Sequence, residues 1–213
     1  MNPNIHPNPK LLAFDADGVL IDYHQAYAAA YTRAFGTPTP VLDPLAYWPK
    51  ERYGIPHLKG SDLALFRAEF HEQCWESMSA LPGAVDALLS LSAAGYDLVC
   101  VSAVSPERRL ARMRNLRQLG FPIHEVHACH GVYDKISPKA LTLNELMPAA
   151  FIDDFLPYFR GVDLRIHRAL LDRSPNGSPN HSEERSQLVD STHPDVSTFA
   201  QNWLADDVLP FKK

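Results

Sequence analysis

The chain has 213 residues, of which 46% are hydrophobic and 21% charged, and it carries a formal net charge of -5. That length fits one domain with a full core and a modest insertion rather than two ordinary domains. We expect no nucleic-acid partner, because a net negative charge does not provide a basic binding surface. We also expect no membrane partner, because no apolar run reaches the ~18 residues of a membrane span.

The N-terminal segment 1–10 is polar and proline-rich, without the basic and apolar regions of a secretory signal. We therefore expect a cytoplasmic protein, present as a monomer or homodimer. The three cysteines show no CxxC spacing, which argues against a disulfide framework and a zinc knuckle. His127, Cys129 and His130 leave two interpretations open, a metal site or an ordinary strand end.

The segment 11–22, LLAFDADGVLID, contains the first predicted strand, which is buried on both faces. Its apolar run ends at Asp15, Asp17 and Gly18, and in an open parallel sheet ligands bind at the carboxyl ends of strands. Two aspartates at this spacing can serve a hard cation, or provide one carboxylate for attack and one for proton transfer. Taken alone, the pattern fits equally well with acids that cap the next helix.

Residues 23–80 form a predicted helical insertion. Aromatic and alanine residues at three- and four-residue steps predict a helix over 23–35, and a second helix is predicted over 61–78. The second helix should have an inner face of Leu65, Phe66, Phe70 and Trp75. The polar residues of the insertion that we consider as specificity contacts are Arg52, His57, Lys59, Arg67 and His71.

The rest of the chain alternates between helices and strands. Caps, glycines and apolar periodicity predict helices over 84–95, 105–120, 137–147 and 193–208, and strands over 96–104, 123–129, 149–155 and 165–171. The helix over 105–120 should have an apolar face of Leu110, Met113, Leu116 and Leu119. The polar segment 172–187 is predicted to be a mobile surface loop, although it begins at a strand's carboxyl end.

This alternation predicts an α/β fold with a doubly wound, Rossmann-like parallel sheet and a small α-helical insertion after the first strand. Asp15, Ser102, Asp153 and Asp154 then all lie just past the carboxyl ends of strands. Side chains in such positions converge on one site at that edge of the sheet.

Four short motifs follow one another along the chain: DADGVL at 15–20, LVCVSA at 98–103, a lysine at a helix start, and FIDDF at 151–155. Together they resemble the haloacid dehalogenase superfamily, whose members are mostly phosphatases and phosphotransferases. The resemblance implies a core domain of residues 1–22 and 81–213 and a helical C1 cap of residues 23–80. The fourth motif reads DD rather than GDxxxD, which leans toward nucleotidase-like members.

The first motif carries the expected chemistry. Asp15 would attack phosphorus and form an aspartyl phosphate, while Asp17 would protonate the leaving oxygen and then take a proton from the hydrolytic water. The resemblance implies that the position of Asp17 is not an aspartate in the dehalogenases proper. Phosphoryl transfer is therefore favoured over carbon–halogen cleavage.

A dianionic phosphate beside several carboxylates requires cations, and Mg²⁺ suits a shell made only of oxygen ligands. By resemblance, the metal ligands are the Asp15 carboxylate, the Asp17 backbone carbonyl and Asp154. Asp153 would then orient Asp154 or a metal-bound water.

The remaining motifs would hold the phosphate. The Ser102 hydroxyl and the backbone N–H of Ala103 would bind its oxygens through neutral donors. Lys139 and Lys135 both qualify as the motif lysine. We choose Lys139, because it stands at the second position of a predicted helix with Leu143 four residues on.

These features predict a Mg²⁺-dependent phosphatase whose partner is a small phosphorylated metabolite. The first alternative is a nucleotidase-like member acting on a nucleoside monophosphate. The others are a phosphomutase or phosphotransferase on the same fold, and a catalytically silent binding protein.

Overall fold

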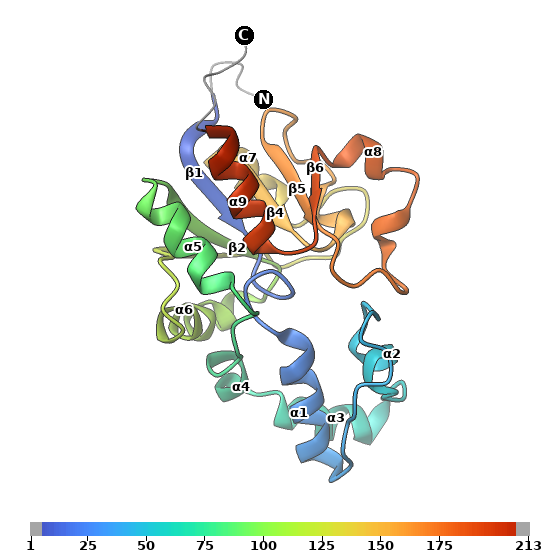
Figure 1. Cartoon of the computed structure of the whole chain (residues 1–213). Coiled ribbons are helices and arrows are strands. Elements are labelled where there is room, and N and C mark those ends of the chain that lie inside the picture. Colours follow the sequence, from blue (N-terminus) through green and yellow to red (C-terminus); the bar gives the residue numbers. More distant parts are fainter. Residues whose placement is uncertain (1–5, 208–213) are drawn as a thin grey trace.

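The computed structural model describes residues 6–207 and is built around a six-stranded sheet (Figure 1). All neighbouring strands run parallel, in the order β3-β2-β1-β4-β5-β6. The strands are β1 (Asn8–Phe14), β2 (Asp97–Ser102), β3 (Glu125–Ala128), β4 (Pro148–Asp153), β5 (His167–Leu171) and β6 (Ser191–His193). This topology confirms the predicted doubly wound α/β fold. The strand order reverses direction between β1 and β4, the place where such sheets bind ligands.

Helices and 3-10 turns connect the strands. The helices of the core are α5 (Ala84–Ala93), α6 (Arg109–Gln118), α7 (Ala140–Leu146), α8 (Arg185–Leu188) and α9 (Val196–Asp207). The insertion holds α1 (Tyr23–Phe35), α2 (Pro49–Tyr53), α3 (Gly60–Glu69) and α4 (Glu72–Glu76). The 3-10 turns are η1 (Pro106–Arg108), η2 (Leu156–Phe159) and η3 (Pro179–His181). Among the described residues, no helix is both long enough and apolar enough to cross a membrane.

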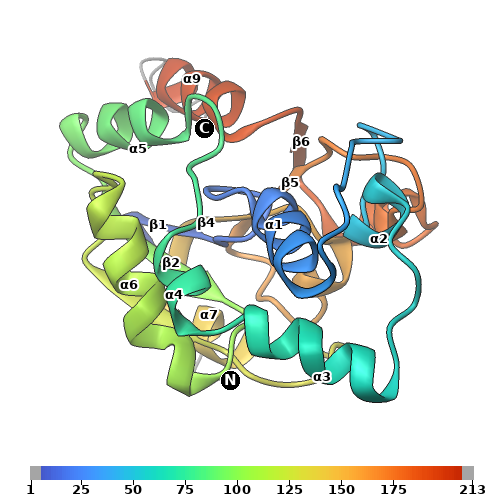
Figure 2. The same ribbon diagram turned by 90° about the horizontal axis from the view of Figure 1, so that it is seen from below.

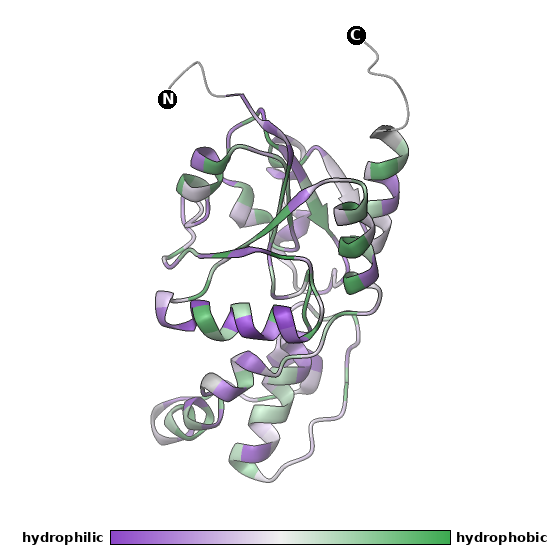
Figure 3. Ribbon diagram, turned by 90° about the vertical axis from the view of Figure 1, so that its left-hand side faces the viewer, coloured by the Kyte–Doolittle hydropathy of each residue, from purple (hydrophilic) through white to green (hydrophobic). Residues whose placement is uncertain are grey.

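Successive residues of β1 pack into two different cores. Leu12 and Phe14 lie in a core with residues of α5 and α9, whereas Leu11 and Ala13 lie in a second core with residues of α7. Side chains alternate between the faces of a strand, so the buried part of β1, residues 11–14, needs apolar residues at every position. Hydrophobic and hydrophilic residues alternate along the longer helices (Figure 3), as is typical of helices that bury one face.

A tight turn after β1 positions the first motif. The amides of Leu20 and Ile21 both donate to the Ala16 carbonyl, at 2.9 and 3.0 Å. Gly18 has φ +81°, and a Cβ at this position would lie 2.1 Å from Asp154 Oδ2. Glycine is therefore required here both for the backbone conformation and for the approach of Asp154.

The insertion packs on itself through aromatic rings. The ring centroids of Tyr27 and Phe66 lie 4.6 Å apart, those of Phe66 and Phe70 5.6 Å, and those of Phe70 and Trp75 5.3 Å. Phe66 is buried, and Phe70 and Trp75 also pack against the core of the sheet. The predicted inner face is therefore confirmed for these three residues.

The prediction of one helix over 61–78 is wrong, since the segment forms two helices, α3 and α4. Phe70 leaves the helical conformation, with φ -93° and ψ 52°, and His71 caps α4 by accepting the Gln73 amide on its ring Nδ1. The prediction for Leu65 is also wrong, because this residue is 53% exposed. The break redirects the chain, so Trp75 reaches the inner face from α4 rather than from α3.

The end of the insertion is tied to the core. The Asn115 side chain on α6 donates hydrogen bonds to the carbonyls of Glu76 and Met78, at 3.2 and 2.8 Å. Figure 2 shows α4 beside α6. The predicted apolar face of α6 is wrong at Leu110, which is 56% exposed. The buried residues of α6 are Ala111, Arg112, Asn115 and Leu116.

The segment 172–187 differs from the predicted mobile surface loop. It contains η3 and the start of α8, and it bonds to the insertion. The backbone of Asn176 accepts from the Tyr47 amide at 2.9 Å and donates to the Leu45 carbonyl at 3.0 Å, and Trp48 Nε1 donates to the Gly177 carbonyl at 3.0 Å. These backbone groups lie in irregular segments, where no periodic sequence pattern predicts which groups bond to one another.

Two smaller differences concern the C-terminal part. The edge strand β6, Ser191–His193, is missing from the predicted elements, because three polar residues carry no strand pattern. The closing helix begins at Val196 rather than at residue 193. Its predicted end at 208, like residues 1–5 of the N-terminal segment, lies outside the described residues.

Candidate active site

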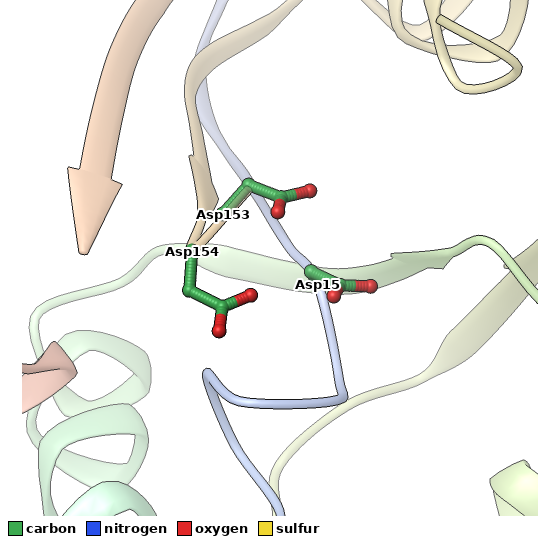
Figure 4. Close-up of side chains that lie close together, drawn as sticks. All are labelled: Asp15, Asp153 and Asp154. Atoms are coloured by element: carbon green, nitrogen blue, oxygen red, sulfur yellow. The ribbon is translucent and has the colours of Figure 1, made fainter. Parts of the chain in front are cut away.

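Three carboxylates meet at the carboxyl edge of the sheet. Asp15 follows β1, and Asp153 and Asp154 stand at the end of the neighbouring strand β4 (Figure 4). One oxygen from each of the three lies within 4.8 Å of the others. Asp15 and Asp153 are 4% and 0% exposed. The structure thus brings together the acids of the first and fourth motifs.

Lys139 joins this cluster from the residue that precedes α7. Its Nζ lies 2.8 Å from Asp15 Oδ1 and 2.6 Å from Asp153 Oδ2, and the side chain is 0% exposed. Burial alone would lower the pKa of Lys139, but Asp15 and Asp153 together raise it above its ordinary value. The ammonium therefore stays charged. Lys135, by contrast, lies in an exposed segment, so Lys139 is the lysine that contacts Asp15.

Ser102 ends β2 beside this cluster. Its side chain is 0% exposed, and its Oγ has no hydrogen-bond partner among the described residues. Ala103 lines the same cavity as Asp15. A buried hydroxyl without a hydrogen-bond partner is costly, and the binding of a phosphate oxygen by Ser102 stays a prediction.

Asp17 is held by an arginine that the sequence analysis missed. Arg112 of α6 donates through Nη2 to both carboxylate oxygens of Asp17, at 2.7 and 2.8 Å. The Arg112 side chain is 0% exposed, and its guanidinium lies 5.1 Å from the centroid of the Trp75 ring. Burial raises the pKa of Asp17, and Asp15 adds to this effect, while Arg112 opposes it. The net effect is a pKa of Asp17 above the ordinary value of a carboxyl group.

The fourth motif is held from two sides. Asp153 Oδ1 accepts the Phe155 amide at 2.9 Å, which fixes the side chain that also contacts Lys139. Asn180, in the segment 172–187, donates to the Asp154 carbonyl and accepts the Leu156 amide, both at 2.8 Å. Asn180 is 1% exposed. The segment expected to be a surface loop therefore supports the backbone of the site.

The acid cluster fits a hard cation. Burial raises the pKa of Asp154 well above its ordinary value, and the neighbouring Asp153 raises it further, although Arg173 opposes both. Burial likewise raises the pKa of Asp153, with Asp15 adding to the effect and Lys139 opposing it. Lys139 already pairs with two of the carboxylates, and no described residue donates a hydrogen bond to the Asp154 side chain. An oxygen-only set with one uncompensated carboxylate is the type of site that Mg²⁺ prefers.

A cavity of about 160 Å³ opens directly onto Asp15, Asp17 and Asp154. Its other walls are largely aromatic, with Tyr47 and Trp48 from the insertion and three rings from the core. The lining aromatic residues are Tyr47, Trp48, Tyr133, Phe155 and Tyr158. The insertion therefore contributes part of the cavity wall through Tyr47 and Trp48.

The polar residues that we considered as specificity contacts lie elsewhere. None of Arg52, His57, Lys59, Arg67 and His71 lines either cavity that touches the aspartates, as far as the described residues show. Arg52 instead donates to the Pro44 carbonyl at 2.6 Å, within the insertion. The insertion residues that do line the cavities include Tyr47 and Trp48. An adjacent aromatic pair in an irregular segment is the signal that would have identified them.

His127, Cys129 and His130 do not form a group with metal-ligand spacing among the described residues. Within residues 6–207, the single group of His, Cys, Asp and Glu residues with metal-ligand spacing is the aspartate cluster. Cys129 is buried after β3, with its Sγ 3.4 Å from Thr142 Oγ1. The interpretation as an ordinary strand end is therefore the one that the structure supports.

No protein-family model and no curated protein matches the sequence, but solved structures share its fold. One is a HAD family hydrolase from Deinococcus radiodurans with bound phosphate and sodium, with a TM-score of 0.63 and 16% identity over 95% of this chain and 98% of that chain. A second is the L-2-haloacid dehalogenase of Xanthobacter autotrophicus, with a TM-score of 0.61 and 17% identity over 92% and 98% of the two chains. A third is a predicted phosphoglycolate phosphatase from Haemophilus somnus 129PT, with a TM-score of 0.59 and 15% identity over 92% and 98%.

The chain thus has the fold of haloacid dehalogenase-like hydrolases over nearly its whole length. These three proteins include both a dehalogenase and a predicted phosphatase. A shared fold does not choose between those chemistries, so the choice depends on the residues of the site.

Proposed function

We propose that this protein is a Mg²⁺-dependent phosphatase of the haloacid dehalogenase superfamily that hydrolyses a small phosphorylated metabolite. One observation carries the proposal: Asp17 lies in the same cavity as Asp15 and Asp154. Phosphate-ester hydrolysis needs a proton for the leaving oxygen, and Asp17 provides a carboxyl group for that task beside the nucleophile. A dehalogenase, whose leaving group is a halide, has no such requirement.

In the first step Asp15 attacks phosphorus. A bond forms between its carboxylate oxygen and phosphorus, and the bond between phosphorus and the leaving oxygen breaks. The electron pair of the broken bond stays on the leaving oxygen, which receives the proton of Asp17. The products of this step are the free alcohol and an aspartyl phosphate on Asp15.

In the second step water attacks phosphorus and gives up a proton to Asp17. The bond to Asp15 breaks, so both carboxyl groups return to their starting states. Arg112 binds both Asp17 oxygens in this structure, so one of these hydrogen bonds has to open when Asp17 donates or accepts a proton. Because Arg112 fixes the carboxyl group and opposes the rise in its pKa, we assign Arg112 the role of orienting Asp17 and limiting its pKa.

The other residues of the site bind the phosphoryl oxygens and balance their negative charge. Lys139 stays positive between Asp15 and Asp153 and offsets the charge that builds up on the phosphoryl oxygens. The Ser102 hydroxyl and the Ala103 amide donate to the same oxygens. Asp15, the Asp17 carbonyl and Asp154 would hold Mg²⁺, with Asp153 orienting them, and the ion would supply the remaining positive charge.

The test is an assay of both chemistries on the purified protein. Phosphate release from p-nitrophenyl phosphate and a panel of phosphorylated metabolites is compared with chloride release from 2-chloropropionate, with Mg²⁺ and with EDTA. We expect Mg²⁺-dependent phosphate release, which Asp17→Asn lowers by about 10²–10⁴-fold. Asp163→Asn is a matched control, because Asp163 pairs with Arg165 and lines neither cavity of the site. Chloride release without phosphate release would overturn the proposal.

A further inference from the structure

A second cavity, of about 140 Å³, adjoins the phosphoryl site and shares Asp17 and Asp154 with it. Its outer wall comes from the insertion, including His24 and Trp48, and Arg173 lines it from the segment after β5. Because Asp17 is the proposed proton donor to the leaving oxygen, a cavity that starts at Asp17 is where the alcohol part of a substrate would lie. This assignment rests on the proposed function.

Arg173 is a cation without a hydrogen-bonded or ion-paired partner, although its charge opposes the rise in the pKa of Asp154. Its Nε is buried and unbonded, and no hydrogen bond or ion pair joins the side chain to another described residue. The other arginines near the site are satisfied: Arg112 binds Asp17, and Arg185 binds Asp172 at 2.9 Å. A half-buried guanidinium with unused donors is costly, so this one is suited to an anion that arrives with the ligand.

Arg173 is also the single cationic side chain in the lining of this cavity. The histidine beside it does not share that role. Burial lowers the pKa of His24 to about 4, and its Nε2 bonds to the Tyr47 carbonyl at 2.7 Å. At neutral pH the imidazole is therefore uncharged, and Arg173 is the one positive charge in the lining, beside the carboxyl groups of Asp17 and Asp154.

We infer that Arg173 binds a carboxylate on the alcohol part of the substrate, which is therefore a phosphate ester of a small hydroxy acid. A planar guanidinium binds a carboxylate through two parallel hydrogen bonds, and one positive charge matches one negative charge. A second phosphate is a poorer match, since its two charges would face Asp17 and Asp154 across the same small space. One water molecule occupies about 30 Å³ in the liquid, so the cavity accommodates only a few carbon and oxygen atoms.

The test compares two esters that differ only at the group facing Arg173. In 3-phosphoglycerate a carboxylate replaces the terminal hydroxymethyl group of glycerol 3-phosphate. Phosphate release is measured for the wild type, Arg173→Gln, Arg173→Lys and the surface control Arg117→Gln. We expect the wild type to favour 3-phosphoglycerate through a lower KM. In Arg173→Gln this preference should fall by about 10–100-fold, as expected for the loss of a charge-assisted bond.

Arg173→Lys should keep part of the preference, because it keeps the charge but not the paired geometry. Independently of any variant, glycerate should inhibit the wild type more strongly than glycerol does. Equal KM values of the wild type for the two esters, or equal losses on both in Arg173→Gln, would overturn the inference and leave the phosphatase intact. Failure to release phosphate from either ester and from p-nitrophenyl phosphate would instead overturn the proposed function, and the inference with it.

Discussion

Replacing Asp154 by asparagine should stabilise the metal-free protein at neutral pH, although it should abolish Mg²⁺ binding. Asp154 is the carboxylate of the cluster without an ion pair or side-chain hydrogen bond among the described residues, whereas Asp15 and Asp153 share Lys139. Oxygens of the three lie within 4.8 Å of one another. The variant therefore removes repulsion without breaking an ion pair, although it also removes the attraction between Asp154 and Arg173.

The size of the effect follows from these distances. Two unit charges 4.8 Å apart repel by about 3.5 kcal/mol at an effective dielectric constant of about 20. Lys139 offsets part of the repulsion from both neighbours, which leaves a net gain in the free energy of unfolding of about 2 kcal/mol. For a chain of this length, that gain raises Tm by about 4–8 °C.

The stability that Asp154→Asn gains over the wild type should increase as the pH rises. The folded state holds the pKa of Asp154 above its unfolded value, so the folded state binds the proton more tightly than the unfolded state. Wild-type stability is then lost as the pH rises from about 4, the unfolded pKa, through the raised folded pKa. Near pH 4 the wild type and Asp154→Asn should have the same Tm, and near pH 7.5 they should differ most.

The assay is thermal unfolding of both proteins in EDTA and in Mg²⁺. In EDTA the variant should have the higher Tm, and in Mg²⁺ the wild type should. The reason is that Mg²⁺ stabilises the wild type by about 2.7 kcal/mol at a hundredfold excess over its Kd, and the variant hardly at all. A variant that is less stable than the wild type in EDTA at pH 7.5 would refute the reasoning. Equal stabilisation of both proteins by Mg²⁺ would refute it as well.

Three further substitutions, with Lys135→Ala as a control, test individual residues of the site. Asp15→Asn should lower turnover by roughly 10⁶-fold, as the loss of a nucleophile does, with an unchanged circular dichroism spectrum. Lys139→Ala should lower kcat/KM by about 10²–10³-fold, whereas Lys135→Ala, at an exposed position, should change it less than about twofold; phosphate release measures both. Arg112→Met should raise the pKa of Asp17 and shift the basic limb of the pH profile of kcat/KM to higher pH. It should also lower the free energy of unfolding by about 2–3 kcal/mol in a denaturant titration, because the Asp17 carboxyl group would lose both hydrogen bonds from Arg112.

The elements that the sequence predicts well are those with strong local patterns. The apolar runs before Asp15, Ser102 and Asp153 identify three central strands, since a strand buried on both faces needs apolar residues throughout. The same runs place those side chains at one edge of the sheet, where the structure brings the aspartates together. Lys139 is likewise predictable, because Ser137 and Pro138 mark a helix start.

The residues that sequence reasoning missed depend on contacts between distant segments. In the sequence, Arg112 is indistinguishable from the other arginines of its helix, which are expected at the surface. Arginine is rarely buried without a partner, and the partner of Arg112, Asp17, lies 95 residues away in the chain. Trp48 and Arg173 stand in irregular segments that only the folded chain brings to the same cavity. Asn180 supports the fourth motif from a segment whose composition indicates a mobile loop.

The central claim is that Asp15 carries the phosphoryl group during turnover. The direct test is an acid quench of the protein during reaction with Mg²⁺ and a radiolabelled phosphate ester, followed by peptide mapping of the label. In the wild type, we expect label on the peptide that contains Asp15, chased into free phosphate on addition of unlabelled ester. Asp17→Asn should still accept the label from an ester with a good leaving group, but release it more slowly. Phosphate release at an unchanged rate by Asp15→Asn, or label on any other residue, would contradict the account.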